Sequence, residues 1–148
     1  MVSGRHSILV VEDSIAEAEM VQVALMEGGI GDGVTYLRSG QSAIEYLEAG
    51  HACDLMLLDL NLPGMTGFEV LRSVRSLENW KDLPVFVMSG STASRDIKQC
   101  YELGATAYIC KPVHLPDILK TGRSIADYLE KGILPESETT PVPRPSTS

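Results

Sequence analysis

The sequence predicts an α/β fold in which a doubly wound, five-stranded parallel sheet carries helices on both faces. Short β-branched, apolar runs alternate with longer segments of helical spacing along the chain. This alternation is typical of βαβ units and of a parallel sheet. The first, third and fourth runs are almost wholly apolar, as strands buried on both faces are.

The strands are predicted from these apolar runs, at residues 7–11, 34–37, 55–58, 84–88 and 106–110. The first helix begins at Ile15, because Ser14 supplies an N-cap and Glu17 follows three residues later, which is the pattern of a capping box. It ends at the Gly28–Gly29 pair, since glycine commonly closes a helix. The next three helices are predicted from apolar spacing of three and four, around residues 43–47, 68–74 and 96–103.

The final helix is amphipathic and runs from Leu115 to about Leu129. Gly122 lies inside it and costs about 1 kcal/mol relative to alanine. Four apolar residues lie near the end of this helix: Ile125, Leu129, Ile133 and Leu134. They form a candidate surface for a protein partner or a second copy of the chain. Packing on the sheet is the alternative.

The composition changes near residue 133. Four of the eight prolines lie in the stretch that follows, and Ser and Thr make up most of the rest. Such segments bury too little apolar surface to fold. We therefore predict one folded domain over residues 1–132 and a disordered tail over residues 133–148.

Charge and composition exclude several classes of function. The net charge is −8 and Lys and Arg form no cluster, which argues against nucleic-acid binding. No apolar run approaches the ~20 residues of a membrane span, and Glu12 and Asp13 interrupt the only candidate for a signal peptide. Three cysteines without a CxxC pair indicate a reducing compartment, so a cytoplasmic protein is expected.

Polar residues follow four of the predicted strands: Glu12–Asp13, Asp59, Ser89 and Lys111. The carboxyl ends of parallel strands share one edge, where ligands bind in such sheets. Clustered carboxylates repel one another unless a hard cation lies between them, and oxygen ligands favour Mg²⁺ or Mn²⁺. A lysine in the same place can pair with a carboxylate or with a phosphoryl oxygen.

These groups suit phosphoryl transfer to a carboxylate. An aspartate is already ionised at neutral pH and needs no general base. Alignment and neutralisation of the phosphoryl charge are then the remaining tasks, and a cation and Lys111 can meet them.

Four stretches of the chain, ILVVEDS, LMLLDLNLPGMTGFEVL, PVFVMSGS and GATAYICKP, resemble the receiver domain of two-component response regulators. The resemblance extends over about residues 6–131. It implies a flavodoxin-like sheet with strand order 2-1-3-4-5. It also implies that Asp59 is the phosphoacceptor. Mg²⁺ (or Mn²⁺) would be held by Asp13 directly, by Glu12 through water, by Asp59, and by the backbone carbonyl of Asn61.

The resemblance implies further roles beside the acceptor. Lys111 would pair with the phosphoryl group, and its bond to Pro112 would be cis. Ser89 would be the switch hydroxyl, and Tyr108 the switch aromatic that rotates inward when Ser89 moves. Ser89 stands where threonine is common, and Gly90 follows it in place of alanine, so this loop is expected to be looser.

The functional hypothesis is a single-domain response regulator, not an enzyme, that signals through altered protein contacts. Its donor would be a histidine kinase or a histidine phosphotransfer protein, and the EDS and GQSAIEYLEAG segments resemble regulators paired with phytochrome-type and hybrid kinases. A degenerate receiver that acts without phosphorylation is the alternative.

Two other functions fit the sequence less well. An aspartyl-phosphate phosphatase usually needs a second aspartate where Asn61 stands. A flavin or nucleotide module needs a glycine-rich loop, and EDSIAE contains no glycine.

Overall fold

The computed structural model describes residues 6–135 and contains the predicted alternation of strands and helices. The strands are β1 (Ile8–Val11), β2 (Val34–Leu37), β3 (Leu55–Asp59), β4 (Val85–Ser89) and β5 (Ala107–Cys110). The helices are α1 (Ile15–Glu27), α2 (Gly40–Glu48), α3 (Gly67–Ser76), α4 (Ser94–Glu102) and α5 (Leu115–Lys131). All neighbouring strands pair in parallel, in the order β2-β1-β3-β4-β5, which confirms the predicted fold class.

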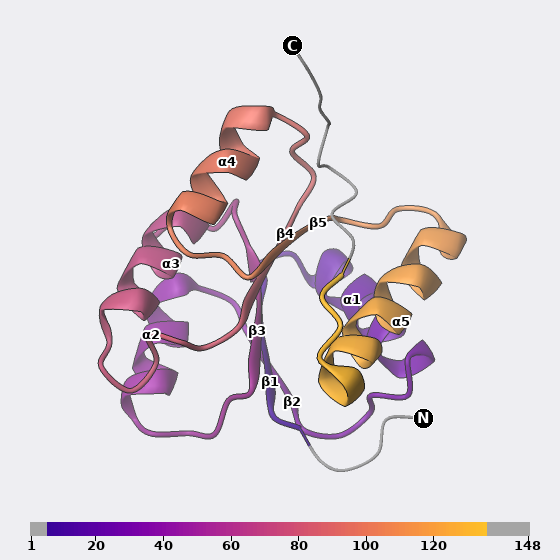
Figure 1. Ribbon diagram of the computed structural model, residues 1–148, viewed down its shortest axis with the longest axis horizontal. Helices are drawn as coiled ribbons and strands as arrows, with labels where there is room; N and C mark the ends of the chain where they lie inside the picture. The colour runs from indigo at the N-terminus through magenta and orange to yellow at the C-terminus, as the bar shows by residue number, and fades with distance from the viewer. Residues whose placement is uncertain (1–5, 136–148) are drawn as a thin grey trace.

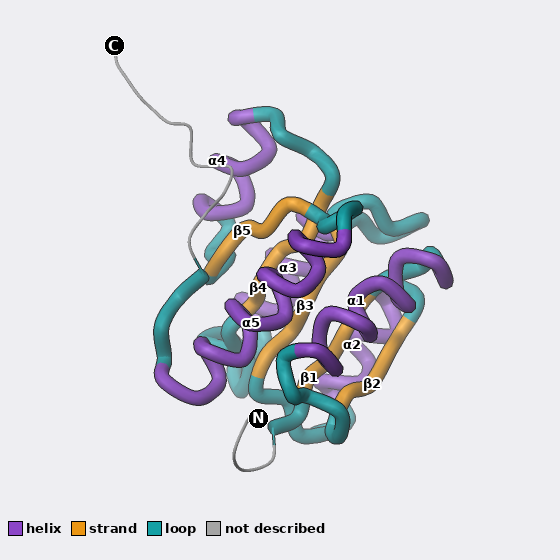
Figure 2. Tube along the Cα trace, turned by 90° about the vertical axis from the view of Figure 1, so that its right-hand side faces the viewer, coloured by secondary structure: helices purple, strands orange, loops and turns teal. Residues whose placement is uncertain are grey.

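The sheet separates two layers of helices. Helices α2, α3 and α4 cover one face, and α1 and α5 cover the other (Figures 1 and 2). Successive strand residues point to opposite faces, so β1 supplies Leu9 and Val11 to the first layer and Ile8 and Val10 to the second. The central strands are fully buried, which explains their unbroken apolar sequences.

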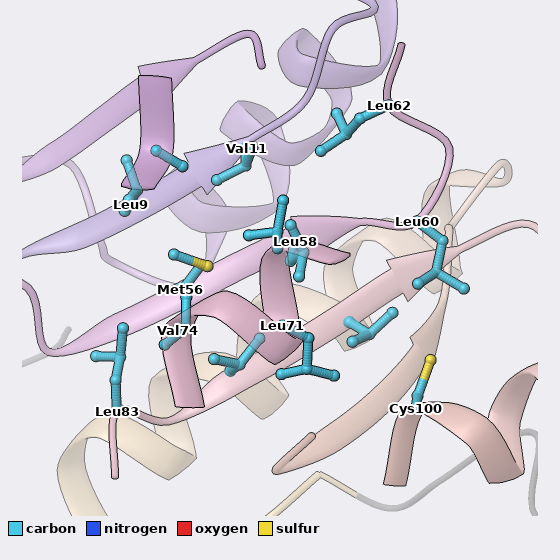
Figure 3. Packing of buried hydrophobic residues seen from close by; sticks show 14 of the residues in the cluster. Leu9, Val11, Met56, Leu58, Leu60, Leu62, Leu71, Val74, Leu83 and Cys100 are labelled. Carbon is cyan, nitrogen blue, oxygen red and sulfur yellow. The ribbon is translucent and has the colours of Figure 1, made fainter. Parts of the chain in front are cut away.

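The larger core lies under α2, α3 and α4. Met56 and Leu58 of β3 lie against Leu71 and Val74 of α3 within this cluster (Figure 3). Fully burying a side chain of this size contributes about 1.5–3 kcal/mol. Apolar clusters pack on both faces of β3 and β4 and thereby position the residues at the ends of these strands.

Gly122 has a packing role that its helix propensity does not reveal. Helices α1 and α5 run side by side (Figures 1 and 2), and a Cβ atom on Gly122 would lie 1.9 Å from the carbonyl oxygen of Ala24. A Cβ atom on Gly28 would lie 2.4 Å from the carbonyl oxygen of Gly122. Backbone atoms cannot turn aside as side chains do, so glycine is required at this crossing.

Helix α5 ends at Lys131, where Gly132 adopts a left-handed conformation with a φ of 70°. The four apolar residues of the candidate partner surface therefore separate into two groups, and a partner contact stays a prediction. Ile125 is fully buried against the sheet, and Leu129 is half-buried there. Ile133 and Leu134 lie beyond the helix and are exposed.

Most of the predicted tail lies outside the described residues, which end at residue 135. Within residues 6–135, no helix has the length and apolar character needed to cross a bilayer.

The strand register sets the geometry of the sheet edge. Val11 pairs with Leu58, so Glu12 follows β1 beside Asp59. Asp59 pairs with Met88, and Ser89 pairs with Cys110, the residue before Lys111. Residues that are far apart in the chain thereby meet at one edge.

Candidate phosphoacceptor site

Asp59 is the last residue of β3 and is only 3% exposed. Its Oδ1 atom lies 3.0 Å from Nζ of Lys111 and accepts a hydrogen bond of 3.2 Å from the backbone N–H of Asn61. The turn that follows is tight, because Gly67 at the start of α3 approaches the Asp59–Leu60 backbone. A Cβ atom on Gly67 would lie 2.5 Å from the carbonyl oxygen of Asp59.

Lys111 is surrounded by three carboxylates. Its Nζ atom lies 2.9 Å from Oε1 of Glu12 and 3.0 Å from Oδ1 of Asp59, and it also donates to Oε1 of Glu17. Burial of the ammonium opposes its charge, but hydrogen bonds to Glu17, Glu12 and Asp59 outweigh burial and raise the pKa of Lys111. The lysine is therefore a fixed cation at the centre of the site.

Glu12 lies opposite Lys111 and is also buried. Burial raises the pKa of Glu12, and its bonds to Lys111 and to the N–H of Ser14 oppose that shift. The Ser14 N–H donates to Oε2 of Glu12 at 3.2 Å. One carboxylate thus anchors both the lysine and the start of α1.

The predicted capping box is only half present. The Ser14 hydroxyl accepts the N–H of Glu17 at 3.2 Å, as predicted. The reciprocal bond is not the one that forms: Glu12 takes the Ser14 N–H, and the Glu17 side chain reaches across to Lys111. The capping pattern assigned Glu17 to the helix end, and no local signal indicated a contact 94 residues away.

A divalent cation has suitable donors here. Ligand oxygens of Glu12, Glu17 and Asp59 all lie within 4.8 Å of one another, and carboxylate oxygens are what Mg²⁺ and Mn²⁺ prefer. Asp13 is half-buried and is not part of this group, so its role as a direct ligand stays a prediction. Asn61 contacts Asp59 through its backbone N–H, so a role for its carbonyl also stays a prediction.

Ser89 ends β4, Tyr108 lies in β5, and both side chains are fully buried. Ser91 connects them. Its N–H donates to the Ser89 hydroxyl at 3.1 Å, and its carbonyl accepts a hydrogen bond of 2.6 Å from the Tyr108 hydroxyl. Tyr108 thus occupies the inward position, and burial raises its pKa.

The same serine begins α4. The Ser91 hydroxyl accepts the N–H of Ala93 at 3.2 Å and donates to Oδ2 of Asp96 at 2.7 Å. Ala93 has no capping side chain of its own. A movement of Ser89 would therefore reach both β5 and α4 through Ser91.

Tyr101 of α4 covers the edge of the sheet. Its hydroxyl accepts the backbone N–H of Tyr108 at 3.0 Å, a donor on the outer side of β5. An unpaired edge donor is otherwise left to water or to another chain. Helix α4 is thereby tied to the strand that carries Tyr108.

Tyr101→Phe is expected to leave that N–H without its partner and to lower the free energy of unfolding by about 1 kcal/mol. Hydrogen exchange at the Tyr108 amide should accelerate about fivefold, the factor that corresponds to this energy. Tyr46→Phe is the matched control, because the Tyr46 hydroxyl contacts Thr35 far from β5. Equal exchange at Tyr108 in both variants would show that the contact does not protect the strand.

An opening of about 470 Å³ lies beside Lys111. Its walls include Glu17, Asn61, Gly90 and Thr92 as well as Lys111. A Cβ atom on Gly90 would meet nothing within 4 Å. Lys111 thus connects this space to Asp59, which its Nζ atom contacts at 3.0 Å. The peptide bond between Lys111 and Pro112 is trans, since the described residues contain no cis peptide bond. The expected cis bond at this position is therefore wrong.

Comparison with known proteins identifies this arrangement. The family model of the response regulator receiver domain matches residues 8–123. The chain belongs to this family. The receiver assignment, inferred from four short stretches of sequence, is thereby confirmed together with the sheet order.

Several relatives of this receiver are known as sequences. Response regulator Rcp1 of Synechocystis sp. is 36% identical over 135 residues, which cover 86% of this chain and 92% of that protein. The probable methanogenesis regulatory protein FilR2 of Methanothrix harundinacea is 33% identical over 126 residues, covering 82% of this chain and 81% of its own. Two-component response regulator ORR12 of Oryza sativa subsp. japonica is 32% identical over 111 residues, which cover 75% of this chain and 90% of that protein.

Solved structures of similar proteins share the receiver fold. The Mn²⁺-bound form of response regulator Rcp1 superposes with a TM-score of 0.76 at 33% identity, covering 89% of this chain and all (100%) of that one. The phosphorylated cyanobacterial phytochrome response regulator RcpA superposes with a TM-score of 0.79 at 32% identity, and the match covers 88% of this chain and 97% of that one. The first of these holds a divalent metal, and the second carries a phosphoryl group.

Proposed function

We propose that this receiver accepts a phosphoryl group on Asp59 from a histidine kinase or a histidine phosphotransfer protein. The observation that carries the proposal is the contact between the Asp59 carboxylate and Lys111 at the carboxyl edge of the sheet. A buried carboxylate held by a fixed cation that lines a cleft is suited to receive a dianionic group.

The transfer is a displacement at phosphorus. A carboxylate oxygen of Asp59 forms the new P–O bond while the bond from phosphorus to the donor imidazole breaks, and the imidazole keeps the electron pair. Asp59 needs no base, since a carboxylate has no proton to lose. Lys111 is placed to hydrogen-bond a phosphoryl oxygen as the charge arrives.

A divalent cation fits the same donors. We assign it to Glu12, Asp13, Asp59 and Asn61, the positions that the resemblance to receivers implies. Support comes from the oxygens of Glu12 and Asp59, which lie with that of Glu17 within 4.8 Å of one another, and from a relative of this chain that is solved with Mn²⁺. When bound, Mg²⁺ would neutralise part of the negative charge on the phosphoryl oxygens.

Output is proposed to run through α4 and β5. The Ser89 hydroxyl is the group that would move toward a phosphoryl group, and Ser91 connects it to Tyr108 and to the start of α4. A change at Ser89 would then alter the surface that a downstream protein meets. We infer the donor class from the relatives, and the likeness to the cyanobacterial phytochrome response regulator RcpA favours a phytochrome-type kinase as the donor.

The proposal predicts that Mg²⁺ and acetyl phosphate add one labile phosphoryl group to the protein, and that Asp59→Asn abolishes this addition. Intact mass spectrometry measures both. Asp32→Asn is the matched control, because it removes the same charge from an exposed loop. Equal phosphorylation of the Asp59→Asn protein would contradict the assignment. No addition to the wild type would favour a receiver that signals without phosphorylation.

A further inference from the structure

Glu17 differs from the other two carboxylates that hold Lys111. The side chains of Glu12 and Asp59 are 4% and 3% exposed, whereas that of Glu17 is 41% exposed. Glu17 lies in the first turn of α1, so its side chain can swing into solvent without unfolding anything. It is therefore the contact that Lys111 can release most easily.

Glu17 also faces the space that a phosphoryl group would enter. It lines the opening beside Lys111 together with Asn61 and Gly90. A phosphoryl group on Asp59 would seek the same ammonium that Glu17 occupies. Two anions competing for one cation cannot both gain its full attraction.

We propose that Glu17 is a positioning residue that restrains Lys111 in the unphosphorylated receiver and competes with the phosphoryl group for it. This inference rests on the proposed phosphorylation of Asp59. Glu17 would hold Lys111 at the mouth of the site before transfer and would give way when the phosphoryl group arrives. The cost of displacing Glu17 would limit both the phosphorylated fraction and its lifetime.

Glu17→Gln tests the inference, with Glu19→Gln as the matched control. Glu19 lies on the same helix and is exposed, so both variants lose one charge from α1. The first measurement is acetylation of Lys111 by acetic anhydride, mapped by mass spectrometry against exposed Lys98 as the internal reference. Acetylation of Lys111 is expected to rise about threefold in Glu17→Gln, as loss of a half-exposed ion pair predicts, and to stay unchanged in Glu19→Gln.

The second measurement is phosphorylation by acetyl phosphate at saturating Mg²⁺. Glu17→Gln is expected to reach a higher phosphorylated fraction and to keep the phosphoryl group about threefold longer than Glu19→Gln. Unchanged Lys111 acetylation, or an unchanged phosphoryl lifetime, would overturn the inference. A lower fraction that more Mg²⁺ restores would also overturn it, because Glu17 would then be a metal ligand.

The acetylation and phosphorylation measurements together distinguish a failure of this inference from a failure of the proposed function. If the wild type accepts no phosphoryl group, the proposed function fails. Acetylation of Lys111 does not depend on phosphorylation, so it alone then supports or overturns Glu17 as a positioning residue.

Discussion

Lys111→Met is expected to lower the free energy of unfolding by about 3 kcal/mol, because it leaves buried carboxylates without their cation. Glu12 and Asp59 are nearly inaccessible to water, so solvent cannot replace the lysine. Glu17 is partly solvated and adds little to this cost. Urea denaturation measures the effect. Lys98→Met, at an exposed site on α4, should stay within about 0.5 kcal/mol of the wild type.

Mg²⁺ should stabilise Lys111→Met more than the wild type. In the wild type the cation and the lysine compete for the same carboxylates, and the variant removes that competition. The comparison requires only melting curves with and without millimolar Mg²⁺. An equal rise in Tm for both proteins would mean that Mg²⁺ binds away from these carboxylates.

The cost of Lys111→Met should also depend on pH. Burial already raises the pKa of Glu12, and loss of the lysine removes a contact that opposes this shift. A folded-state pKa above the unfolded value means that the native state binds more protons, so stability falls as pH rises through that range. The loss in free energy of unfolding of Lys111→Met, relative to the wild type, should therefore be smaller at pH 5 than at pH 8. A deficit that grows toward acid pH would contradict this expectation.

Gly122→Ala is the second substitution with a large expected effect. A methyl group there would meet the Ala24 carbonyl oxygen at 1.9 Å, so α1 and α5 would have to separate. Overpacking of this kind costs about 3 kcal/mol, against about 1 kcal/mol gained from helix propensity. The net loss of about 2 kcal/mol should lower Tm by about 4–8 °C for a chain of this size.

Gly31→Ala is the matched control for this comparison. A Cβ atom at Gly31 meets nothing within 4 Å, and its φ is not in the left-handed range. Its Tm should stay equal to or slightly above that of the wild type. If Gly122→Ala were as stable as Gly31→Ala, the close crossing of α1 and α5 would be wrong.

The fold could be predicted because its signals are local. The buried strands β1, β3 and β4 appear in the sequence as short apolar runs, and parallel pairing follows from the helices between them. The ends of those strands and of β5 then identify Glu12, Asp59, Ser89 and Lys111 as neighbours. The resemblance to receivers added the strand order, which the comparisons confirm.

Other features depend on contacts between distant residues. Glu17 and Lys111 lie on different elements, and only the folded chain shows that the glutamate leaves its capping position. Gly122 has poor helix propensity, and only the approach of α1 explains its presence. The hydrogen bond from Tyr108 to Tyr101 joins two side-by-side elements and has no sequence pattern of its own.

The central claim is that Asp59 itself carries the phosphoryl group. Borohydride reduces an acyl phosphate to an alcohol, so a phosphorylated aspartate becomes homoserine. The protein should be treated with Mg²⁺ and acetyl phosphate, reduced, digested and sequenced by tandem mass spectrometry. We expect homoserine at position 59, in an amount that matches the phosphorylated fraction. Homoserine at another aspartate, with position 59 unchanged, would contradict the claim.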